Sequence, residues 1–228
     1  MNVHSAALPP TPAAPRRPPA RRQIGAGDKR TVILNAATRV FARRGFFNAQ
    51  VADVAREAGV AAGTVYLYFR SKDDLLTSIF EKSMTRALEE ADRALAGVTD
   101  PVERLRRLAR VHLGGLGSRR DLAIVFQVEL RQSTKFMERF SAAQLRTYLD
   151  HLRDAVRAGQ EAGVFRADLN ATLAAKAIFG ALDEMVTNWV LSNRDHRLVD
   201  DADPVIDLLV NGMQAQPARR AATRPARV

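Results

Sequence analysis

Apolar side chains recur along most of this chain at intervals of three and four residues, the spacing of one face of an α-helix. In the first such segment the apolar positions are 33, 36, 37, 40 and 41. The sequence contains no two-residue alternation of a half-buried strand and no Asn-Gly or Asp-Gly turn between apolar runs. It therefore predicts an all-α fold of about nine helices, at 29–44, 51–58, 62–68, 71–95, 120–132, 134–161, 170–192 and 203–214, with one more beginning at 101.

Residues that satisfy unpaired backbone groups mark several helix boundaries. The sequence from Ser71 to Asp74 has the pattern of a capping box before the long helix. Asp100 followed by Pro101 supplies a cap and a proline at the first helical position. Either Asp168 or Asn170 is expected to cap the helix that ends near residue 192.

The two ends of the chain differ in composition from its middle. Six of the ten prolines fall within the first nineteen residues, and proline sustains neither a helix nor a central strand. Residues 217–228 are similarly rich in alanine and arginine. We expect disordered tails at 1–27 and 217–228, a small helical head at 28–76 and a larger helical body at 77–216.

The net charge of +10 is unevenly placed. The first 30 residues hold six basic side chains and one acid, and the last twelve hold four arginines and no acid. Residues 31–72 hold six basic and two acidic side chains, whereas 73–216 is slightly acidic. This placement favours a polyanion partner for the head, although an arginine-rich solvated surface fits the charge equally well.

Composition and motifs argue against several classes of protein. The chain has no cysteine, which excludes disulfide scaffolds and cysteine nucleophiles and fits a cytoplasmic setting. No run approaches the roughly 20 apolar residues that span a bilayer, and no secretory signal follows the N-terminal arginines. The histidines have no metal-ligand spacing, and His112, on an apolar stripe, is expected to be a satisfied core residue. We expect no enzyme, no metal site, no cofactor and no membrane association.

Two short helices meet at Gly59 in the middle of the head. Short helices joined by a turn of three to four residues with glycine are typical of a helix-turn-helix. Residues 45–75 read GFFNAQVADVAREAGVAAGTVYLYFRSKDDL. The part from Gly63 to Leu75 closely resembles the G-T-[LIV]-Y-x-Y-F-x-[SN]-K-[ED]-x-L run of TetR-family transcriptional regulators. The resemblance covers 29–76 and implies that the head binds double-stranded DNA.

The second short helix is the expected recognition element, because such a helix places its N-terminal residues at base edges in the major groove. Small side chains at 61–63 permit close approach, and Thr64 offers a hydroxyl and a methyl group. By resemblance, Tyr68 and Lys72 correspond to phosphate contacts. The candidate DNA contacts are Gln50, Ala61, Ala62, Gly63, Thr64, Tyr66, Tyr68 and Lys72.

Three positions depart from the family's pattern. Gln50 stands where the family usually has a phosphate-binding threonine, and its amide can donate a similar hydrogen bond. Ala61 replaces the usual serine and gives up an N-cap worth ~1 kcal/mol. Leu67 takes the place of a frequent histidine. These departures leave the fold intact but make the base preference unpredictable.

Two strings in the body resemble a narrower group. DLAIVFQVELRQS at 121–133 and IFGALDEMVTNWVL at 178–191 are similar to strings of acyl-CoA-responsive repressors of fatty-acid degradation. The resemblance implies a homodimer that binds a palindromic operator and is released by a small apolar effector, long-chain acyl-CoA. The ligand would favour a conformer whose heads are wrongly spaced for successive major grooves, ~34 Å apart, with the helix from Ser71 as the lever.

Candidate effector contacts lie in the two strings and near residue 106. Three aromatic side chains either line an acyl tunnel or pack as core. Gln127, Glu129 and Arg131 lie on a largely apolar helix. They either satisfy one another or a neighbouring helix end, or they polarise one mouth of the tunnel. Three arginines suit the phosphates of CoA, because guanidinium binds phosphate bidentately. The candidates are Arg106, Arg107, Phe126, Gln127, Arg131, Phe179 and Trp189.

The helix at 170–192 has a broad apolar face, and the last helix is also apolar. Together they suit a two-helix contribution to a four-helix dimer interface. Gly180 inside the first of them costs ~1 kcal/mol relative to alanine, and close approach of another helix would explain its presence.

Two other interpretations stay open at this stage. A repressor of the same family could control an efflux pump and sense drug-like apolar ligands. Alternatively, the body could be an enzyme or the chain a general nucleoid-binding protein, although no catalytic constellation supports an enzyme. The basic tails would add sequence-independent DNA affinity or reach the minor groove.

Overall fold

The computed structural model describes residues 26–129, 144–192 and 196–213. Regular structure within these ranges is helical, and they contain no strand. The α-helices are α1 (Ala26–Arg44), α2 (Val51–Ala58), α3 (Ala62–Tyr66), α4 (Lys72–Leu95), α5 (Pro101–Gly117), α6 (Arg120–Ile124), α8 (Gln144–Glu161), α9 (Ala171–Leu191) and α10 (Ala202–Met213). Of the expected tails, residues 1–25 and 217–228 lie outside the described ranges.

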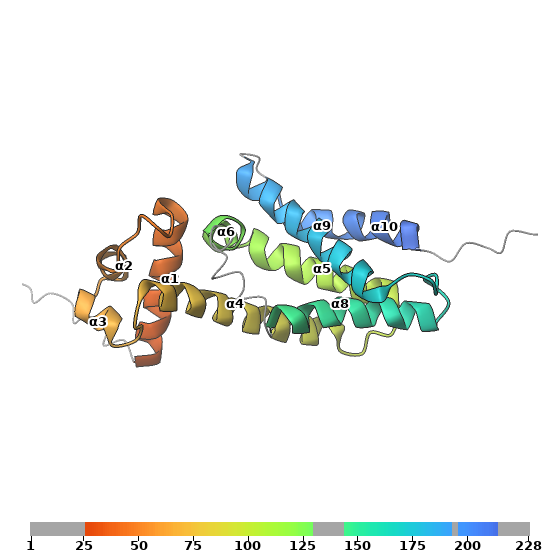
Figure 1. The fold of residues 1–228 in the computed structure, drawn as a ribbon, viewed down its shortest axis with the longest axis horizontal. Coiled ribbons are helices and arrows are strands. Elements are labelled where there is room, and N and C mark those ends of the chain that lie inside the picture. The colour runs from red at the N-terminus through yellow and green to blue at the C-terminus, as the bar shows by residue number, and fades with distance from the viewer. Residues whose placement is uncertain (1–25, 130–143, 193–195, 214–228) are drawn as a thin grey trace, which may run out of the picture.

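The helices α1, α2 and α3 form a small unit at one end of the molecule (Figure 1). Their apolar faces share one core, which explains the spacing of apolar residues in the sequence. Its buried side chains include Ile33, Phe41, Val54, Val65 and Phe69. Arg39 and Arg43 of α1 both pair with Glu57 of α2, and these hydrogen bonds lower the pKa of the Glu57 carboxyl.

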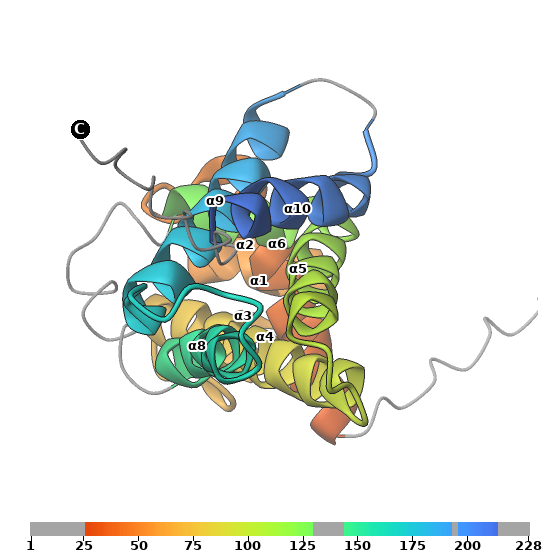
Figure 2. The ribbon, with the colours of Figure 1, turned by 90° about the vertical axis from the view of Figure 1, so that its right-hand side faces the viewer.

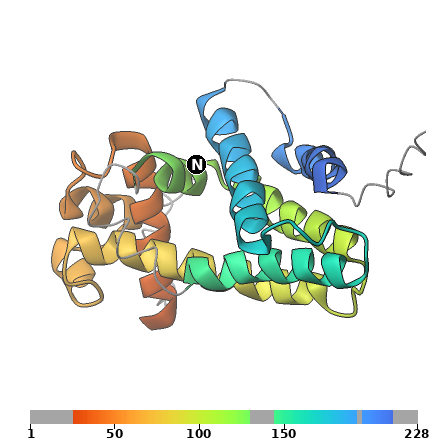
Figure 3. The same ribbon diagram turned by 45° about the vertical axis from the view of Figure 1, so that its right-hand side comes forward.

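The long helix α4 leaves the head and continues into the body, so that one rigid element belongs to both (Figure 1). Seen from the end, α4, α5, α8, α9 and α10 surround the interior of the body (Figure 2). In Figure 3, α8 lies along α4 and α9 crosses above them. No helix in the described ranges is long and apolar enough to cross a bilayer.

Several helix boundaries differ from the expected ones. The first helix begins at Ala26, so residues 26 and 27 are helical instead of part of a tail. Helix α3, expected at 62–68, ends at Tyr66, and the next residues form a turn. Asn170 caps α9, because its side chain accepts hydrogen bonds from two backbone N–H groups of the first turn, whereas Asp168 pairs with Arg166. A 3₁₀ turn, η3 (Leu198–Asp201), precedes α10.

The helix expected at 120–132 changes its winding part-way. After α6 ends at Ile124, residues Val125–Glu129 form one turn of π-helix, η1. A π-helical turn is wider than an α-helical one and is frequently found at functional sites. Residues 130–132 and the first ten residues of the helix expected at 134–161 lie outside the described ranges.

Candidate nucleic-acid interface and ligand pocket

A turn of three residues joins α2 to α3 and sets the angle between the two helices. Gly59 closes α2 with φ +67°, a left-handed conformation that glycine adopts without strain. The N–H of Val60 donates to the carbonyl of Ala55 at 3.0 Å. At the other end of α2, the N–H of Gln50 donates to Oδ2 of Asp53 at 3.1 Å. Both ends of α2 are therefore fixed by local hydrogen bonds.

One side of α3 is buried and the other faces solvent. Val65 and Phe69 are inserted into the core of the head. The residues at 61–63 are exposed, and the Tyr66 side chain, 57% exposed, projects beyond them. Thr64 is only partly exposed at the edge of this surface. The exposed side of α3 lies at the far end of the molecule from α10, free of the body (Figure 1).

Gln50 and Lys72 lie beside α3, at the starts of α2 and α4. Gln50 is exposed. The Lys72 ammonium donates to the carbonyls of Phe47 at 3.1 Å and Ala49 at 3.0 Å, and its Nζ lies 4.6 Å from the centroid of the Phe46 ring. Lys72 thus ties α4 to the loop before α2. An ammonium has three N–H donors, so one is left for an anion in solution.

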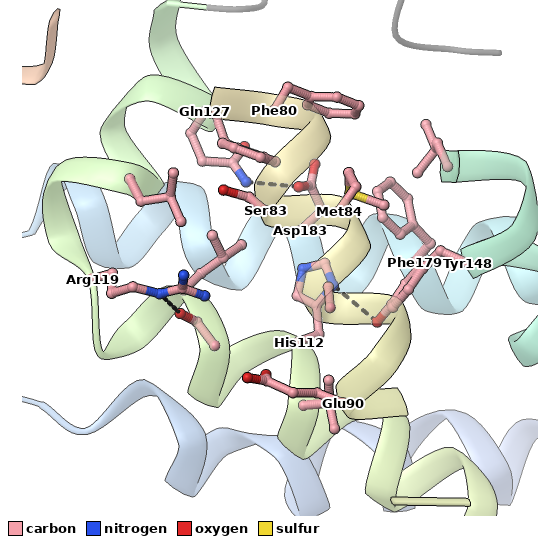
Figure 4. Close-up of a pocket in the computed structure, with 17 residues that line it drawn as sticks. Phe80, Ser83, Met84, Glu90, His112, Arg119, Gln127, Tyr148, Phe179 and Asp183 are labelled. Atoms are coloured by element: carbon pink, nitrogen blue, oxygen red, sulfur yellow. Dashed lines mark hydrogen bonds between the residues drawn. The ribbon is translucent and has the colours of Figure 1, made fainter. Parts of the chain in front are cut away.

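The body contains an apolar pocket of about 170 Å³ (Figure 4). Helices α4, α5, α6, α8 and α9 and the π-helical turn all contribute to its lining. Aromatic and aliphatic side chains form most of its walls: the rings of Phe80 and Phe126 stack with centroids 5.3 Å apart, and Tyr148 meets Phe179 at a steep angle. Such a pocket suits an apolar ligand.

A chain of polar groups crosses the wall formed by η1 and α9. The Gln127 amide donates to Oδ1 of Asp183 at 2.7 Å, and the Thr187 hydroxyl donates to Oε1 of Gln127 at 3.0 Å. Gln127 is buried, and it satisfies its amide through these contacts. In Figure 4 the Asp183 carboxylate lies among the residues around the pocket.

His112 of α5 is only partly satisfied. Its Nδ1 shares a hydrogen bond of 3.1 Å with the Tyr148 hydroxyl, and its ring packs edge-on against Phe179. Its Nε2 is buried without a hydrogen-bond partner. Burial lowers the pKa of His112 to about 4, although the nearby Asp183 acts in the opposite direction. His112 is therefore neutral at pH 7 and, contrary to expectation, leaves one ring nitrogen unpaired.

A basic cleft adjoins the pocket. Ser83, Arg119 and Leu122 line both, so the two meet between α4 and α6. The cleft also borders α1 of the head. The cationic side chains that line it are Arg39, Lys82, Arg86, Arg119 and Arg120, and Asp121 is the one acid in its lining.

Three cations of this cleft, Lys82, Arg119 and Arg120, form no ion pair within the described part of the chain, and Arg120 instead donates to the carbonyls of Val190 and Ser192. Burial lowers the pKa of Lys82, and the positive charges of Arg30 and Arg86 lower it further. Burial and the charge of Arg86 likewise lower the pKa of Arg119, against the opposing charge of Glu90. An anion in the cleft would relieve this repulsion.

The structure brings three of the predicted effector contacts to the pocket and places two elsewhere. Phe126, Gln127 and Phe179 line it. Arg106 pairs with Asp207 of α10 at 2.7 Å, and Arg107 pairs with Glu103 at 3.0 Å; neither lines the pocket or the cleft.

The two remaining candidates have different positions. Trp189 is absent from the lining of this pocket; its Nε1 donates to the carbonyl of His196, and Arg120 lies 4.9 Å from the centroid of its ring. Arg131 lies outside the described residues. Where the structure is described, no cluster of acidic and histidine side chains has the make-up of a metal site.

Comparison with known families agrees with this geometry. Residues 33–79 match the model for bacterial regulatory proteins of the tetR family, and residues 80–212 match that of the C-terminal region of YsiA-like proteins. The chain belongs to the tetR family. This confirms the predicted all-α fold with its helix-turn-helix head and identifies a transcriptional regulator rather than an enzyme.

Relatives in the tetR family include regulators of fatty-acid metabolism. The fatty acid metabolism regulator protein of Bacillus subtilis (strain 168) is 36% identical over 79% of this chain and 93% of its own length. The structure is similar to the fatty acid degradation regulator FadR from Bacillus halodurans, with 39% identity and a TM-score of 0.75. It is also similar to FadR from Bacillus subtilis in complex with stearoyl-CoA, with 35% identity and a TM-score of 0.76. Each structure covers 81% of this chain and 99% of its own.

Sequence reasoning missed several groups at these sites. Asp183 had a signal, since it is an acid within the apolar string at 178–191. Lys82, Arg119 and Tyr148 had none, because nothing in the order of residues shows that α1, α4 and α6 border one cleft or that α8 faces α5.

The neutral state of buried His112 predicts a specific acid sensitivity. Its pKa of about 4 lies below the ordinary 6.5, so the unfolded chain binds the proton more tightly and stability falls as pH decreases from 6.5 towards 4. Replacement of His112 by glutamine should remove up to about 1.4 kcal/mol per pH unit from that slope. Urea unfolding of both proteins at pH 7, 6 and 5 measures it; parallel curves would contradict the assignment.

Proposed function

We propose that this tetR-family protein is a dimeric repressor that binds a palindromic operator and leaves it when long-chain acyl-CoA occupies the body. The observation that carries the effector proposal is the junction of an apolar pocket with a basic cleft in which Lys82 and Arg119 have no acidic partner among the described residues. A ligand with a long apolar chain and an anionic head group matches both parts. The bound stearoyl-CoA of the Bacillus subtilis FadR structure supports this chemistry.

The head at 28–76 is proposed to read DNA through the exposed side of α3. The small side chains at 61–63 let the backbone approach base edges, and Tyr66 extends from the same side. Thr64 and Tyr68, at the margins of this side, are suited to phosphate or sugar contacts. Gln50 and the free N–H of Lys72 would bind phosphates beside them.

The body at 77–216 is proposed to hold the acyl chain in the pocket and the phosphates of CoA in the cleft. Lys82 and Arg119 line the cleft and form no ion pair in the described ranges, and phosphate oxygens would supply the missing counter-charge. Phe80 and Phe126 would contact the acyl chain. The arginines at 106 and 107 are already paired with acids and are not part of this proposal.

A second copy is proposed to cover the exposed apolar surface of α9 and α10. Leu191 on α9 and Leu208 on α10 are each 74% exposed, and Leu173 is 64% exposed. Gly180 is exposed on α9, and no neighbouring atom lies within 4 Å of the position a Cβ would take. No helix of the described chain therefore packs closely against Gly180, and α9 of a partner would be the helix that does so.

The helix α4 would transmit occupancy of the pocket to the head. Phe80, Ser83 and Met84 of α4 line the pocket, while Lys72 at its start is bonded to the loop before α2. Ligand binding would favour a conformer in which two heads no longer match successive major grooves.

The DNA assignment predicts that Tyr66→Ala weakens operator binding without unfolding the head, because the side chain is exposed and outside the core. We expect an affinity loss of roughly tenfold or more, corresponding to ~1–3 kcal/mol for a lost base contact. The measurement is a gel-shift titration on a DNA site that the purified wild-type protein selects from a random pool. Arg157→Ala, at an exposed position of α8, is the control. Equal affinities for all three proteins would reject α3 as the reading element.

The effector assignment predicts that Lys82→Ala weakens stearoyl-CoA binding roughly tenfold, since a hydrogen bond to a charged group contributes ~1.5–3 kcal/mol. Stearate, which lacks the phosphates, should bind both proteins equally. Calorimetric titration measures both ligands, with Arg106→Ala as the control cation. A similar loss of stearate affinity would show that Lys82 does not bind the phosphates of CoA. Preference for a planar cationic drug over stearoyl-CoA would favour an efflux-type regulator.

The dimer assignment predicts that the double variant Leu191→Glu, Leu208→Glu is a folded monomer with weakened operator binding. Two carboxylates on the apolar surface would be desolvated without partners in a dimer. Sedimentation equilibrium gives the mass, and circular dichroism reports the helix content. A variant that remains dimeric would place the interface on other helices.

A further inference from the structure

The described contacts between body and head include one short, buried hydrogen bond in which a carboxylate of the body accepts from the backbone of the head. Glu129 is the last residue of η1, and its side chain is 5% exposed. Its Oε2 accepts a hydrogen bond from the backbone N–H of Phe46 at 2.6 Å. Phe46 follows Gly45, where the chain turns from α1 with φ +77° on the way to α2. A carboxylate of the body thus holds the loop that leads to the helix-turn-helix.

The same π-helical turn forms part of the pocket wall. Phe126 stacks on Phe80 inside the pocket, and Gln127 binds Asp183 and Thr187 of α9. Only one residue separates Gln127 from Glu129. A turn of five residues cannot move its pocket contacts by much without also moving the carboxylate that holds the head.

The pocket must enlarge to receive a long chain. Its volume is about 170 Å³, whereas sites for drug-sized ligands are ~300–1,000 Å³. The two stacked rings are the natural part to separate, because Phe80 is on long α4 but Phe126 is on a short turn with unusual winding. An expanded pocket therefore displaces η1, and the bond between Glu129 and Phe46 belongs to the contracted, empty state.

We propose that Glu129 is a positioning residue that couples the pocket to the head: its bond to the Phe46 N–H stabilises the operator-binding arrangement, and a ligand that displaces Phe126 breaks it. This inference rests on the proposed function for the identity of the ligand and for the sign of the response. Any difference in free energy that Glu129 makes between the two states must appear equally in ligand binding and in operator binding.

The test compares Glu129→Ala with Glu129→Gln, whose amide oxygen can still accept the Phe46 N–H. Operator release is titrated with stearoyl-CoA, and stearoyl-CoA affinity is measured without DNA. For Glu129→Ala we expect release at roughly tenfold lower stearoyl-CoA concentration and tighter stearoyl-CoA binding, because the contracted state has lost a hydrogen bond to a charged group. Glu129→Gln should recover most of the wild-type response.

A purely structural role would give a different result. Loss of general stability would lower the affinities for stearoyl-CoA and operator together, and glutamine would not restore a selective response. Either that pattern or release at an unchanged stearoyl-CoA concentration would overturn the proposal.

A measurement without ligand separates this inference from the proposed function. Gly115 lines the pocket on α5, and Gly115→Leu would fill the pocket from within. Hydrogen exchange at the Phe46 amide should then accelerate in the absence of any acyl-CoA, as it should in Glu129→Ala. If wild type ignores stearoyl-CoA but Gly115→Leu still accelerates this exchange, the effector is wrong and the coupling holds. Unchanged exchange in a folded Gly115→Leu protein would overturn the coupling.

Discussion

The π-helical turn η1 has to satisfy buried polar groups on two sides within five residues. Gln127 faces Asp183 in the pocket wall, and Glu129 faces the Phe46 N–H at the head. Each of these groups would cost ~1–3 kcal/mol if left buried without a partner. Their joint satisfaction fixes the turn between α9 and the loop after α1, and with it one wall of the pocket and the placement of the head.

The charges of the body are arranged in two different ways. The outer surface of α5 has paired arginines: Arg106 with Asp207 and Arg110 with both Glu103 and Asp203. The cleft beside the pocket instead concentrates cations, and Lys82 and Arg119 there have no acidic partner in the described ranges. Paired surface charges contribute little to stability, whereas crowded, partly buried cations favour the binding of an anionic ligand. The proposed position of the CoA phosphates follows from this contrast rather than from the number of arginines.

How far the sequence predicts the sites differs between head and body. In the head, local spacing suffices: Val65 and Phe69 are buried and Tyr66 is exposed, as a short helix with one apolar side requires. In the body, the sequence left open whether Phe126, Phe179 and Trp189 line a tunnel or pack as core, and the structure places Phe126 and Phe179 in the pocket lining but not Trp189. His112 has the pattern of a core residue and nevertheless keeps one ring nitrogen without a partner.

The sequence by itself determined the helical class, the helix-turn-helix with its glycine turn, and the apolar faces that form the two cores, because these depend on residues within a few positions of each other. The tertiary structure decided which arginines meet acids, that α1, α4 and α6 enclose one basic cleft, and that Glu129 reaches Phe46, 83 positions away in the chain. It also decided that the helix after Ile124 winds as a π-turn. The physical reason is that burial and electrostatic partnership are properties of how whole helices pack against each other, and one helix does not encode which neighbour will face it.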